Sequence, residues 1–354
     1  MAAVRIGVVG CGAIAQVHHL PNLALLQDQF EVPVVCDISP DLAEAVAEQF
    51  HVPRYVTDYR ELLAADVDAV LLCHGDPKTE AGLAVLEAGK HLFIEKPVCF
   101  TLSDADAMIA AARGAGVVAQ AGYMKAHDPA FELLAREVES MGPVRFIQVN
   151  HLHTDNSHHL AHFGIRRGGG PPPAAVAKRA DDVAEALGSA VPEEARRVFY
   201  ILAGSMIHDL YGLRILFGQP ERVVSTEVWN GGFGVTAVLA YASGARCAAT
   251  WVELSGIKEF VETLEVYSDD RGAVLSYPTG FSRGIPSQLE IRGVDDEGRS
   301  FRRQPFVDWE IPFVRELRHF HACVTEGLQC RTSLEGARDD VALVIDIVRA
   351  WLDR

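Results

Sequence analysis

Short apolar runs alternate with longer helical patterns along the first 122 residues of the chain. The runs that we expect to form strands are residues 4–9, 32–36, 52–56, 69–73, 91–94 and 117–121. The segments between them carry helix signals, with Ser39-Pro40, Asp58 and Thr101 at the starts of helices and Gly89 at the end of one. Strands that alternate with helices in this way form a parallel sheet with helices on both faces. We therefore expect a first domain of the α/β class over residues 1–122.

The pattern changes after residue 122. A helix is expected over residues 129–141, and the strands expected after it are residues 144–151, 223–229, 235–241, 246–253, 262–267 and 288–292. Turns such as Gly231-Gly232 and Ser243-Gly244 join several of these strands, which is typical of an antiparallel sheet. Helices over residues 313–326 and 333–352 close the chain. We expect an α+β domain over residues 123–354, with oligomerisation through the uncovered face of its open, mostly antiparallel sheet.

Residues 164–197 interrupt this second pattern. A stiff linker runs from Arg166 to Pro173. Apolar side chains then recur at helical spacing, at Val176, Ala180, Val183 and Leu187. We expect an amphipathic helix docked on its own domain, or alternatively a lid over the site or an arm that reaches a neighbouring subunit. Because the insertion joins a histidine-rich stretch to His208, we expect it near the substrate.

Glycines follow the first expected strand, in the sequence Gly10-Cys11-Gly12-Ala13-Ile14-Ala15. Glycines at this place let the backbone approach a pyrophosphate, and the amides of the helix that begins at Ala13 point at the anion. Asp37 closes the next strand, where a carboxylate accepts hydrogen bonds from the ribose hydroxyls of NAD and repels the 2′-phosphate of NADP. We therefore predict a Rossmann domain that prefers NAD, with cofactor contacts from Gly10, Gly12, Ala13, Ile14 and Asp37.

Composition limits the partners and the compartment. The formal net charge of −16 would repel a nucleic-acid backbone. The seven cysteines are scattered without a C-x-x-C pair, as expected in a reducing cytoplasm. The first strand begins directly at the N-terminus, and no apolar run reaches the roughly 18 residues of a membrane span. We expect a cytoplasmic protein that acts on a small molecule, without nucleic acid, membrane or bound metal.

The strand expected at residues 91–94 leads into Glu95-Lys96-Pro97. Ligands of open parallel sheets bind at the carboxyl ends of the strands, which places Glu95 and Lys96 at the cofactor crevice. A lysine there could hydrogen-bond a substrate hydroxyl or carbonyl. The alternative is a surface salt bridge between Lys96 and Glu95.

Several motifs occur in a fixed order along the chain. They are Gly10-Cys11-Gly12-Ala13-Ile14-Ala15, Ala88-Gly89-Lys90-His91, Glu95-Lys96-Pro97, Gly122-Tyr123, Asp128-Pro129-Ala130-Phe131, and the segment 313–327 with Glu316 and Phe320. In this order and spacing the chain resembles the glucose–fructose oxidoreductase and inositol dehydrogenase (Gfo/Idh/MocA) family. The resemblance implies a Rossmann domain, a second domain with an open antiparallel sheet, and NAD(P)-dependent hydride transfer on sugars, cyclitols or related polyols. It also implies that Lys96 touches the reacting oxygen and that a D-x-x-x-H pair completes the proton relay.

That relay is incomplete in this chain. His208 is the best counterpart of the relay histidine, and Gly204 stands where the family usually has aspartate. Asp209 follows His208 directly, but neighbours on a helix point about 100° apart, so we do not expect Asp209 to replace the missing carboxylate. Either another group substitutes, or the chemistry differs from that of a plain alcohol dehydrogenase. The alternative for His208 is a packing histidine at a helix start.

Several groups could substitute for the missing acid. Tyr123 and Lys125 follow the sixth strand, where the family often places residues that contact substrate. A histidine cluster then follows, at His151, His153, His158, His159 and His162. Imidazoles would suit a polyol or glycoside pocket; the alternatives are metal binding and solvated or packing histidines. The candidates for substrate binding are Lys125, His153, His158 and Asp209.

Together these residues favour an NAD-dependent oxidoreductase that transfers hydride between NAD and a secondary alcohol of a sugar, glycoside or cyclitol. Lys96 would polarise or deprotonate the reacting oxygen, with His208 or Tyr123 as the relay. One alternative is a redox-neutral glycosidase or lyase that keeps NAD bound and oxidises its substrate transiently. Another, suggested by Gly204, is a non-catalytic sugar or NAD sensor. We expect a homo-oligomer, either a dimer or a tetramer.

Overall fold

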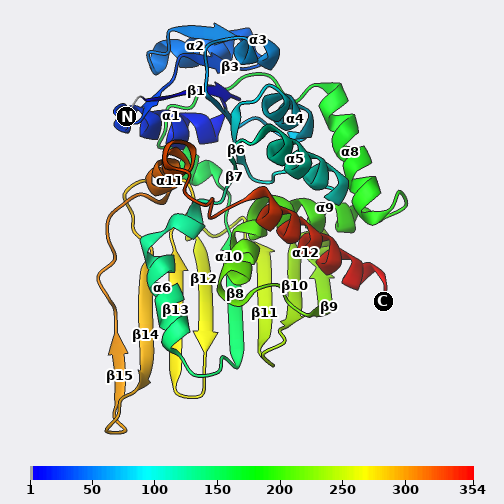
Figure 1. The fold of residues 1–354 in the computed structure, drawn as a ribbon. Helices are drawn as coiled ribbons and strands as arrows, with labels where there is room; N and C mark the ends of the chain where they lie inside the picture. The colour runs from blue at the N-terminus through cyan, green and yellow to red at the C-terminus, as the bar shows by residue number, and fades with distance from the viewer. Residues whose placement is uncertain (1–2) are drawn as a thin grey trace. The chain divides into compact units, whose positions relative to one another are not determined.

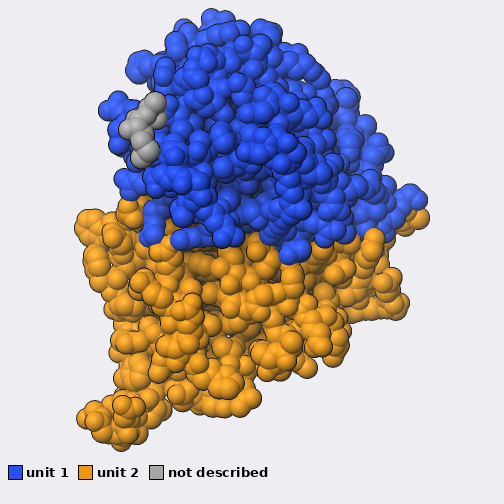
Figure 2. All heavy atoms as spheres, in the orientation of Figure 1, with its two compact units in different colours: residues 1–124, 163–189, 313–341 blue, residues 125–162, 190–312, 342–354 orange. Residues whose placement is uncertain are grey.

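The structure is a computed structural model that describes residues 3–354 (Figure 1). The chain divides into two compact units (Figure 2). Unit 1 contains the chain up to Met124 together with Phe163–Ser189 and Phe313–Val341, and unit 2 contains Lys125–His162, Ala190–Pro312 and Ala342–Arg354. This division differs from the single boundary expected at residue 122, because two later segments fold with unit 1.

Unit 1 is built on a parallel sheet. Within residues 3–354 this sheet has seven strands, in the order β4-β3-β1-β5-β6-β7, with β2 paired to β1. The strands are β1 (Val4–Val9), β2 (Phe30–Glu31), β3 (Val34–Cys36), β4 (Arg54–Val56), β5 (Ala69–Leu72), β6 (His91–Glu95) and β7 (Ala119–Gly122). The helices are η1 (Ala15–His19), α1 (Leu20–Leu25), α2 (Pro40–Gln49), α3 (Tyr59–Leu63), α4 (Thr79–Glu87), α5 (Leu102–Ala115), α8 (Pro173–Leu187) and α11 (Pro312–Glu326). This architecture confirms the expected Rossmann class.

The register of this sheet aligns the ends of its central strands. β1, β5 and β6 are buried along nearly their whole length, as is typical of strands covered on both faces. Val9 pairs with Leu72, and Leu72 pairs with Ile94, so the carboxyl ends of the three strands finish level. Gly10, which follows β1, and Glu95, the last residue of β6, therefore lie along one edge of the sheet.

Side-chain caps fix the start of two helices in unit 1. Asp58 accepts the N–H of Arg60 at 2.8 Å at the start of α3, and Thr101 accepts the N–H of Asp104 at 3.1 Å at the start of α5. Both caps confirm the expected helix starts. Helices α4 and α5 pack side by side (Figure 1).

The insertion forms helix α8, which folds with unit 1 and not with the second half of the chain. Val183 and Leu187 of the expected apolar stripe are buried, whereas Val176 is 48% exposed. Lys178 on α8 lies 3.9 Å from Asp104 on α5. The helix therefore docks through the second half of its stripe and through polar contacts with α5.

Unit 2 is built on a mostly antiparallel sheet. Within residues 3–354 it has eight strands, in the order β15-β14-β13-β12-β8-β11-β10-β9, and β8 and β11 are its parallel pair. The strands are β8 (Phe146–His153), β9 (Arg222–Trp229), β10 (Gly234–Ala240), β11 (Arg246–Glu253), β12 (Val261–Tyr267), β13 (Arg271–Tyr277), β14 (Gln288–Val294) and β15 (Ser300–Arg303). The helices are η2 (Met124–His127), α6 (Pro129–Ser140), α7 (Ser157–Leu160), α9 (Glu193–Ile201), η3 (Leu202–Met206), α10 (Ile207–Phe217), η4 (Asn230–Gly232) and the later part of α12 (Leu334–Leu352). The open antiparallel sheet confirms the second half of the expected fold class.

The two faces of the second sheet differ in polarity. Leu264 and Val266 on β12 are buried, and α6 packs against β13 and β14. On the alternate positions, Asn150 donates to Thr263 at 3.2 Å and to Glu265 at 3.0 Å. The second face is therefore polar and hydrogen-bonded along the strands.

No helix within residues 3–354 combines the length and apolar character needed to cross a membrane.

Candidate active site

The glycine-rich loop after β1 is held by the carboxylate of Asp37. Its Oδ2 accepts the N–H of Cys11 at 2.9 Å, and its Oδ1 accepts the N–H of Ser39 at 2.9 Å. Gly10 has a φ of +94°, and a Cβ there would clash with the backbone of His74. The fold itself therefore requires glycine at position 10. The two backbone hydrogen bonds hold Asp37 beside the loop.

Gly12 behaves differently. Among the described residues, a Cβ built on Gly12 would find no heavy atom within 4 Å beyond its chain neighbours. The fold therefore does not require glycine here, and the absent side chain would point into an open cradle. Helical residues begin directly afterwards with Ala13 and Ile14. This cradle fits the pyrophosphate of a dinucleotide, which needs close backbone approach and the amides of a helix N-terminus.

Residues 165–168 of the insertion, which we call the strap, return to this loop. Gln16 is buried, and its Nε2 donates to the carbonyl of Cys11 at 2.7 Å and to that of Arg166 at 2.9 Å. The Oε1 of Gln16 accepts the N–H of Arg166 at 2.9 Å. A Cβ on Gly168 would lie 2.9 Å from the Cβ of Ser39. The strap therefore runs from the dinucleotide loop to the start of α2, a position that the sequence did not predict.

Lys96 follows β6 at the edge that carries the glycine loop. Glu95 is 5% exposed and accepts a hydrogen bond from His19 Nε2 at 2.7 Å. Burial alone would raise the pKa of Glu95, but the hydrogen bond and charge of His19 lower it below its ordinary value. Buried Lys78 donates to the carbonyl of Pro97 at 3.0 Å. Glu95 is thus a buried carboxylate bound to His19, and the charge of Lys96 also contributes to its lowered pKa.

Tyr123 follows β7, and its side chain is 1% exposed. The neighbouring Gly122 packs against Glu95, where an added Cβ would lie 3.1 Å from the Glu95 Cα. Glu316 on α11 is fully buried in the same unit, and burial together with the charge of Glu95 raises its pKa well above the ordinary value. Glu316 therefore takes up a proton more readily than an ordinary glutamate does.

In unit 2, His151 on β8 and Asp209 on α10 form a buried pair. His151 Nδ1 and Asp209 Oδ2 are 2.9 Å apart, and the residues are 3% and 2% exposed. Burial would raise the pKa of Asp209, but the charge and hydrogen bond of His151 lower it below its ordinary value. His151 Nε2 lies 3.4 Å from His153 Nδ1 and 3.5 Å from Ser205 Oγ. An imidazole oriented by an ionised carboxylate is suited to acid–base chemistry.

Lys125 and Glu262 form a second buried ion pair beside the first. Burial and the charge of Asp209 raise the pKa of Glu262, although Lys125 opposes the shift. The ligand atoms of His151, Asp209 and Glu262 lie within 4.8 Å of one another, a spacing that a metal ion could use. Because the Lys125 ammonium already supplies a positive charge at Glu262, the arrangement favours an ion-pair network over a metal centre.

His208 lies on α10 and is half-buried. Its Nδ1 is 3.0 Å from the hydroxyl of Tyr211, and that hydroxyl accepts the backbone N–H of Lys125 at 3.0 Å. The ring is therefore held through Nδ1, with Nε2 directed away from Tyr211. This contact also ties His208 to the segment that carries Lys125.

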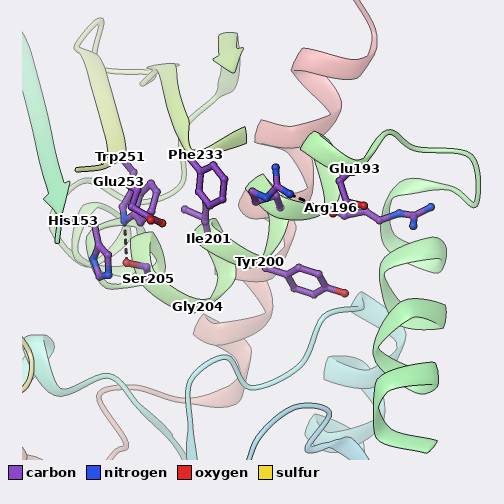
Figure 3. Close-up of a pocket in the computed structure, with 11 residues that line it drawn as sticks. His153, Glu193, Arg196, Tyr200, Ile201, Gly204, Ser205, Phe233, Trp251 and Glu253 are labelled. Atoms are coloured by element: carbon purple, nitrogen blue, oxygen red, sulfur yellow. Dashed lines mark hydrogen bonds and ion pairs between the residues drawn. The ribbon is translucent and has the colours of Figure 1, made fainter. Parts of the chain in front are cut away.

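A cavity of about 470 Å³ opens in unit 2 next to these residues (Figure 3). Its lining residues are His153, Glu193, Arg196, Arg197, Tyr200, Ile201, Gly204, Ser205, Phe233, Trp251 and Glu253. Trp251 Nε1 donates to Ser205 Oγ at 2.9 Å, and the ring of Trp251 stacks on His153 with centroids 5.2 Å apart (Figure 3). Among the described residues, a Cβ on Gly204 would meet no heavy atom within 4 Å. In the family that the chain resembles, this position usually carries an aspartate. The space that its side chain would enter is therefore open at the cavity wall.

The predicted site residues thus fall into two groups. Unit 1 carries the dinucleotide loop, Lys96 and Tyr123, and unit 2 brings together Lys125, His153, Asp209 and His208. His158 on the short helix α7 is exposed. Residues that the sequence did not single out are Gln16, His19, Glu262 and the pairing of His151 with Asp209. In each case the partners come from elements far apart in the chain, so spacing along the sequence gave no signal.

The region that contains the glycine-rich loop matches the model of a known family. Residues 4–123 match the model of the Gfo/Idh/MocA oxidoreductase family, described as an NAD-binding Rossmann fold. Over this region the chain is similar to the Gfo/Idh/MocA oxidoreductases. It is 37% identical over 161 residues to inositol 2-dehydrogenase/D-chiro-inositol 3-dehydrogenase of Shouchella clausii, covering 44% of this chain and 46% of that relative. It is 33% identical over 138 residues to myo-inositol 2-dehydrogenase of Thermotoga maritima, covering 38% and 41%. The matches thus span less than half the length of these relatives.

Solved structures share the fold over nearly the whole chain. UDP-N-acetylglucosamine 3-dehydrogenase of Acidithiobacillus ferrooxidans superposes with a TM-score of 0.74 at 19% identity, covering 99% of this chain and 98% of that one. A 3-ketoreductase of Actinomadura kijaniata in complex with NADP and TDP-benzene superposes with a TM-score of 0.72 at 20% identity, covering 97% and 96%. At these identities the likeness establishes the fold alone.

Proposed function

We propose that this chain is an NAD-dependent oxidoreductase that transfers hydride between the nicotinamide and a secondary alcohol of a sugar, glycoside or cyclitol. The observation that carries the proposal is the level finish of β1 and β6, which sets Lys96 along the same sheet edge as the Gly12 cradle. Relatives named as inositol dehydrogenases support a cyclitol or sugar as the substrate class.

Each residue group has a role in this proposal. The backbone at Gly12, which no side chain covers, and the first helical amides hold the pyrophosphate. Asp37 accepts hydrogen bonds from the ribose hydroxyls. Bound NAD supplies a hydride acceptor. Lys96 binds the reacting oxygen through its ammonium group and stabilises the negative charge that develops when the alcohol loses its proton.

The proton that the alcohol releases needs an acceptor elsewhere in the site, because Gly204 has no side chain. We assign this task to His151 and Asp209, in addition to the relay candidates His208 and Tyr123. Asp209 holds His151 Nδ1, so Nε2 is the atom that exchanges a proton through Ser205 or His153 at the cavity wall. This pair also favours an enzyme over a non-catalytic sensor, because burying an imidazole–carboxylate pair without a task is costly.

For the cofactor, we propose a preference for NAD over NADP. Asp37 is fixed by two backbone amides, so its charge is placed where an added 2′-phosphate would be repelled. The ketoreductase of similar fold was solved with NADP, so the fold does not decide the cofactor. The test is to measure the dissociation constants of this chain for NAD and for NADP. A dissociation constant for NADP as low as that for NAD would overturn it.

The activity test uses the full chain with NAD and a panel of inositols, aldoses and glycosides. We expect NADH absorbance to rise in step with oxidised product identified by mass spectrometry. Lys96→Ala should abolish the signal, and Lys90→Ala, a lysine just before the same strand, should keep it. Normal turnover by the Lys96→Ala variant would remove the assigned role.

A redox-neutral glycosidase or lyase is a second candidate. The strap favours it, because a segment bonded to Gln16 beside the dinucleotide loop would hinder release of the cofactor. Such an enzyme would consume a glycoside without net NADH and would retain NAD through purification. Stoichiometric NADH release assigns the dehydrogenase instead.

A further inference from the structure

A pair of cysteines lies at the end of helix α11, in unit 1. Cys323 is in the last turn of the helix, and Gly327, with a φ of +72°, reverses the chain after it. The N–H of Leu328 donates to the carbonyl of Ala322 at 3.4 Å, which folds the following segment back along the helix. This reversal returns Cys330 to the last turn of α11.

The sulfur atoms are close enough to react with each other after a small side-chain rotation. The Sγ atoms of Cys323 and Cys330 and a ring nitrogen of His319 all lie within 4.8 Å of one another. Cys323 Sγ is 3.4 Å from His319 Nε2, and Cys330 Sγ is 3.7 Å from Gln120 Oε1 on β7. The pair therefore sits between the end of α11 and strand β7.

Its electrostatics differ from those of the other cysteines. The hydrogen bond from Cys330 lowers the pKa of Cys323 to about 5, while Cys330 keeps the shared proton and its own pKa is raised. Burial raises the pKa of the remaining thiols, which are Cys11, Cys36, Cys73, Cys99 and Cys247. Cys323 is therefore the most acidic of these thiols, and Cys330 is its hydrogen-bond donor.

A small molecule can reach the pair at Cys330. Cys330 is part-exposed and lines a cavity of about 250 Å³ together with Leu328, Ser333 and Arg113. Cys323 and the other five cysteines named above are buried, so access to the pair is through Cys330.

We propose that Cys323 and Cys330 form a redox-active dithiol that a hydroperoxide oxidises to an intramolecular disulfide. The thiolate sulfur attacks one peroxide oxygen, the O–O bond breaks, and a sulfenic acid and a hydroxide are formed. The second sulfur attacks the sulfenic sulfur, the S–S bond forms, and the sulfenic hydroxyl leaves as water. The two thiols lose two electrons and two protons in total, and hydrogen peroxide is reduced to two waters.

A zinc site is the competing interpretation of the same cluster. His319 Nε2, which would have to bind the metal, already accepts the N–H of Arg331 at 2.9 Å. This bond occupies the ring lone pair that a metal would need, so the geometry points to the dithiol.

The test treats the full chain with hydrogen peroxide, alkylates the remaining thiols, and maps the peptides by mass spectrometry. We expect a cross-link between Cys323 and Cys330 with the loss of two hydrogens, reversed by dithiothreitol, while the other five cysteines stay open to alkylation after unfolding. Cys323→Ser and Cys330→Ser should each prevent the cross-link, and Cys247→Ser should keep it.

Three results would overturn the proposal, and they need only the wild-type chain. The first is peroxide treatment that leaves both thiols reduced while other cysteines react. The second is oxidation of either thiol to a sulfinic acid without a cross-link. The third is one equivalent of zinc retained by the purified protein and released when the thiols are alkylated, which would identify a metal site instead.

Discussion

The role of Asp37 gives the sharpest prediction for the cofactor. An ionised carboxylate offers about four lone-pair positions. The structure assigns one acceptor bond on each oxygen, from the N–H of Cys11 and from the N–H of Ser39. About two positions remain, which matches the two hydroxyls of an NAD ribose. Asp37→Ala should therefore weaken both the loop and NAD binding.

The expected size follows from these bonds. A hydrogen bond to a charged group contributes roughly 1.5–3 kcal/mol, and Asp37 is part-exposed, so we use the lower end. Two lost ribose bonds then cost about 3 kcal/mol, which corresponds to a roughly 100-fold rise in the Kd for NAD. NADP lacks one of these hydroxyls, and the substitution also removes the carboxylate charge that repels its 2′-phosphate. The Kd for NADP should therefore rise little or fall. Loss of the two loop bonds should lower the free energy of unfolding by about 3 kcal/mol.

The assay is a fluorescence titration with NADH and NADPH, accompanied by urea unfolding at the same pH. Asp41→Ala is the matched control, because it removes an exposed acid from the first turn of α2 without touching the loop. Asp37→Asn retains one oxygen and should fall between wild type and Asp37→Ala. A folded Asp37→Ala variant with the wild-type ratio of NAD to NADP affinity would refute this account of cofactor choice.

Two further predictions concern buried carboxyl groups. Asp209→Asn should lower kcat by about 10²–10⁴-fold, because His151 loses its ionised partner. The exposed Asp270→Asn is its control, and an unchanged kcat in a folded Asp209→Asn variant would exclude the pair from catalysis. Glu316 has a raised pKa in the folded state, so the stability that its protonated form provides is complete below its unfolded pKa and is lost as pH rises through the folded pKa. Glu316→Gln should therefore be more stable than wild type at about pH 8 and similar to it at about pH 4 in urea unfolding. A destabilised Gln variant at the higher pH would show that Glu316 is ionised and paired.

Much of the fold could be predicted because local signals agreed with the packing. The apolar runs of unit 1 are strands buried on both faces, and caps such as Asp58 and Thr101 start their helices as expected. The strand Arg271–Tyr277 was not predicted, because small and polar residues at its ends leave only a short apolar run between them. Ser39 was expected to cap α2, but its backbone amide is instead bound by Asp37.

The candidate site was predictable only where one segment carries the chemistry. The glycine loop and Glu95-Lys96-Pro97 are contiguous motifs, so the sequence was enough to select them. The partner of Asp209 was not predictable, because His151 comes from a strand that precedes a long insertion. The same holds for the insertion itself, whose helix docks on unit 1 through Val183 and Leu187 while Val176 of the same stripe stays exposed.

Direct hydride transfer is the central claim, and an isotope label tests it most directly. NADH in which both hydrogens at nicotinamide C4 are replaced by deuterium would be supplied with the keto form of a sugar or inositol that the enzyme accepts. We predict deuterium on the newly formed carbinol carbon, in an amount equal to the NADH consumed. With the Lys96→Ala variant we expect no labelled product. Product that forms without the label would contradict the account.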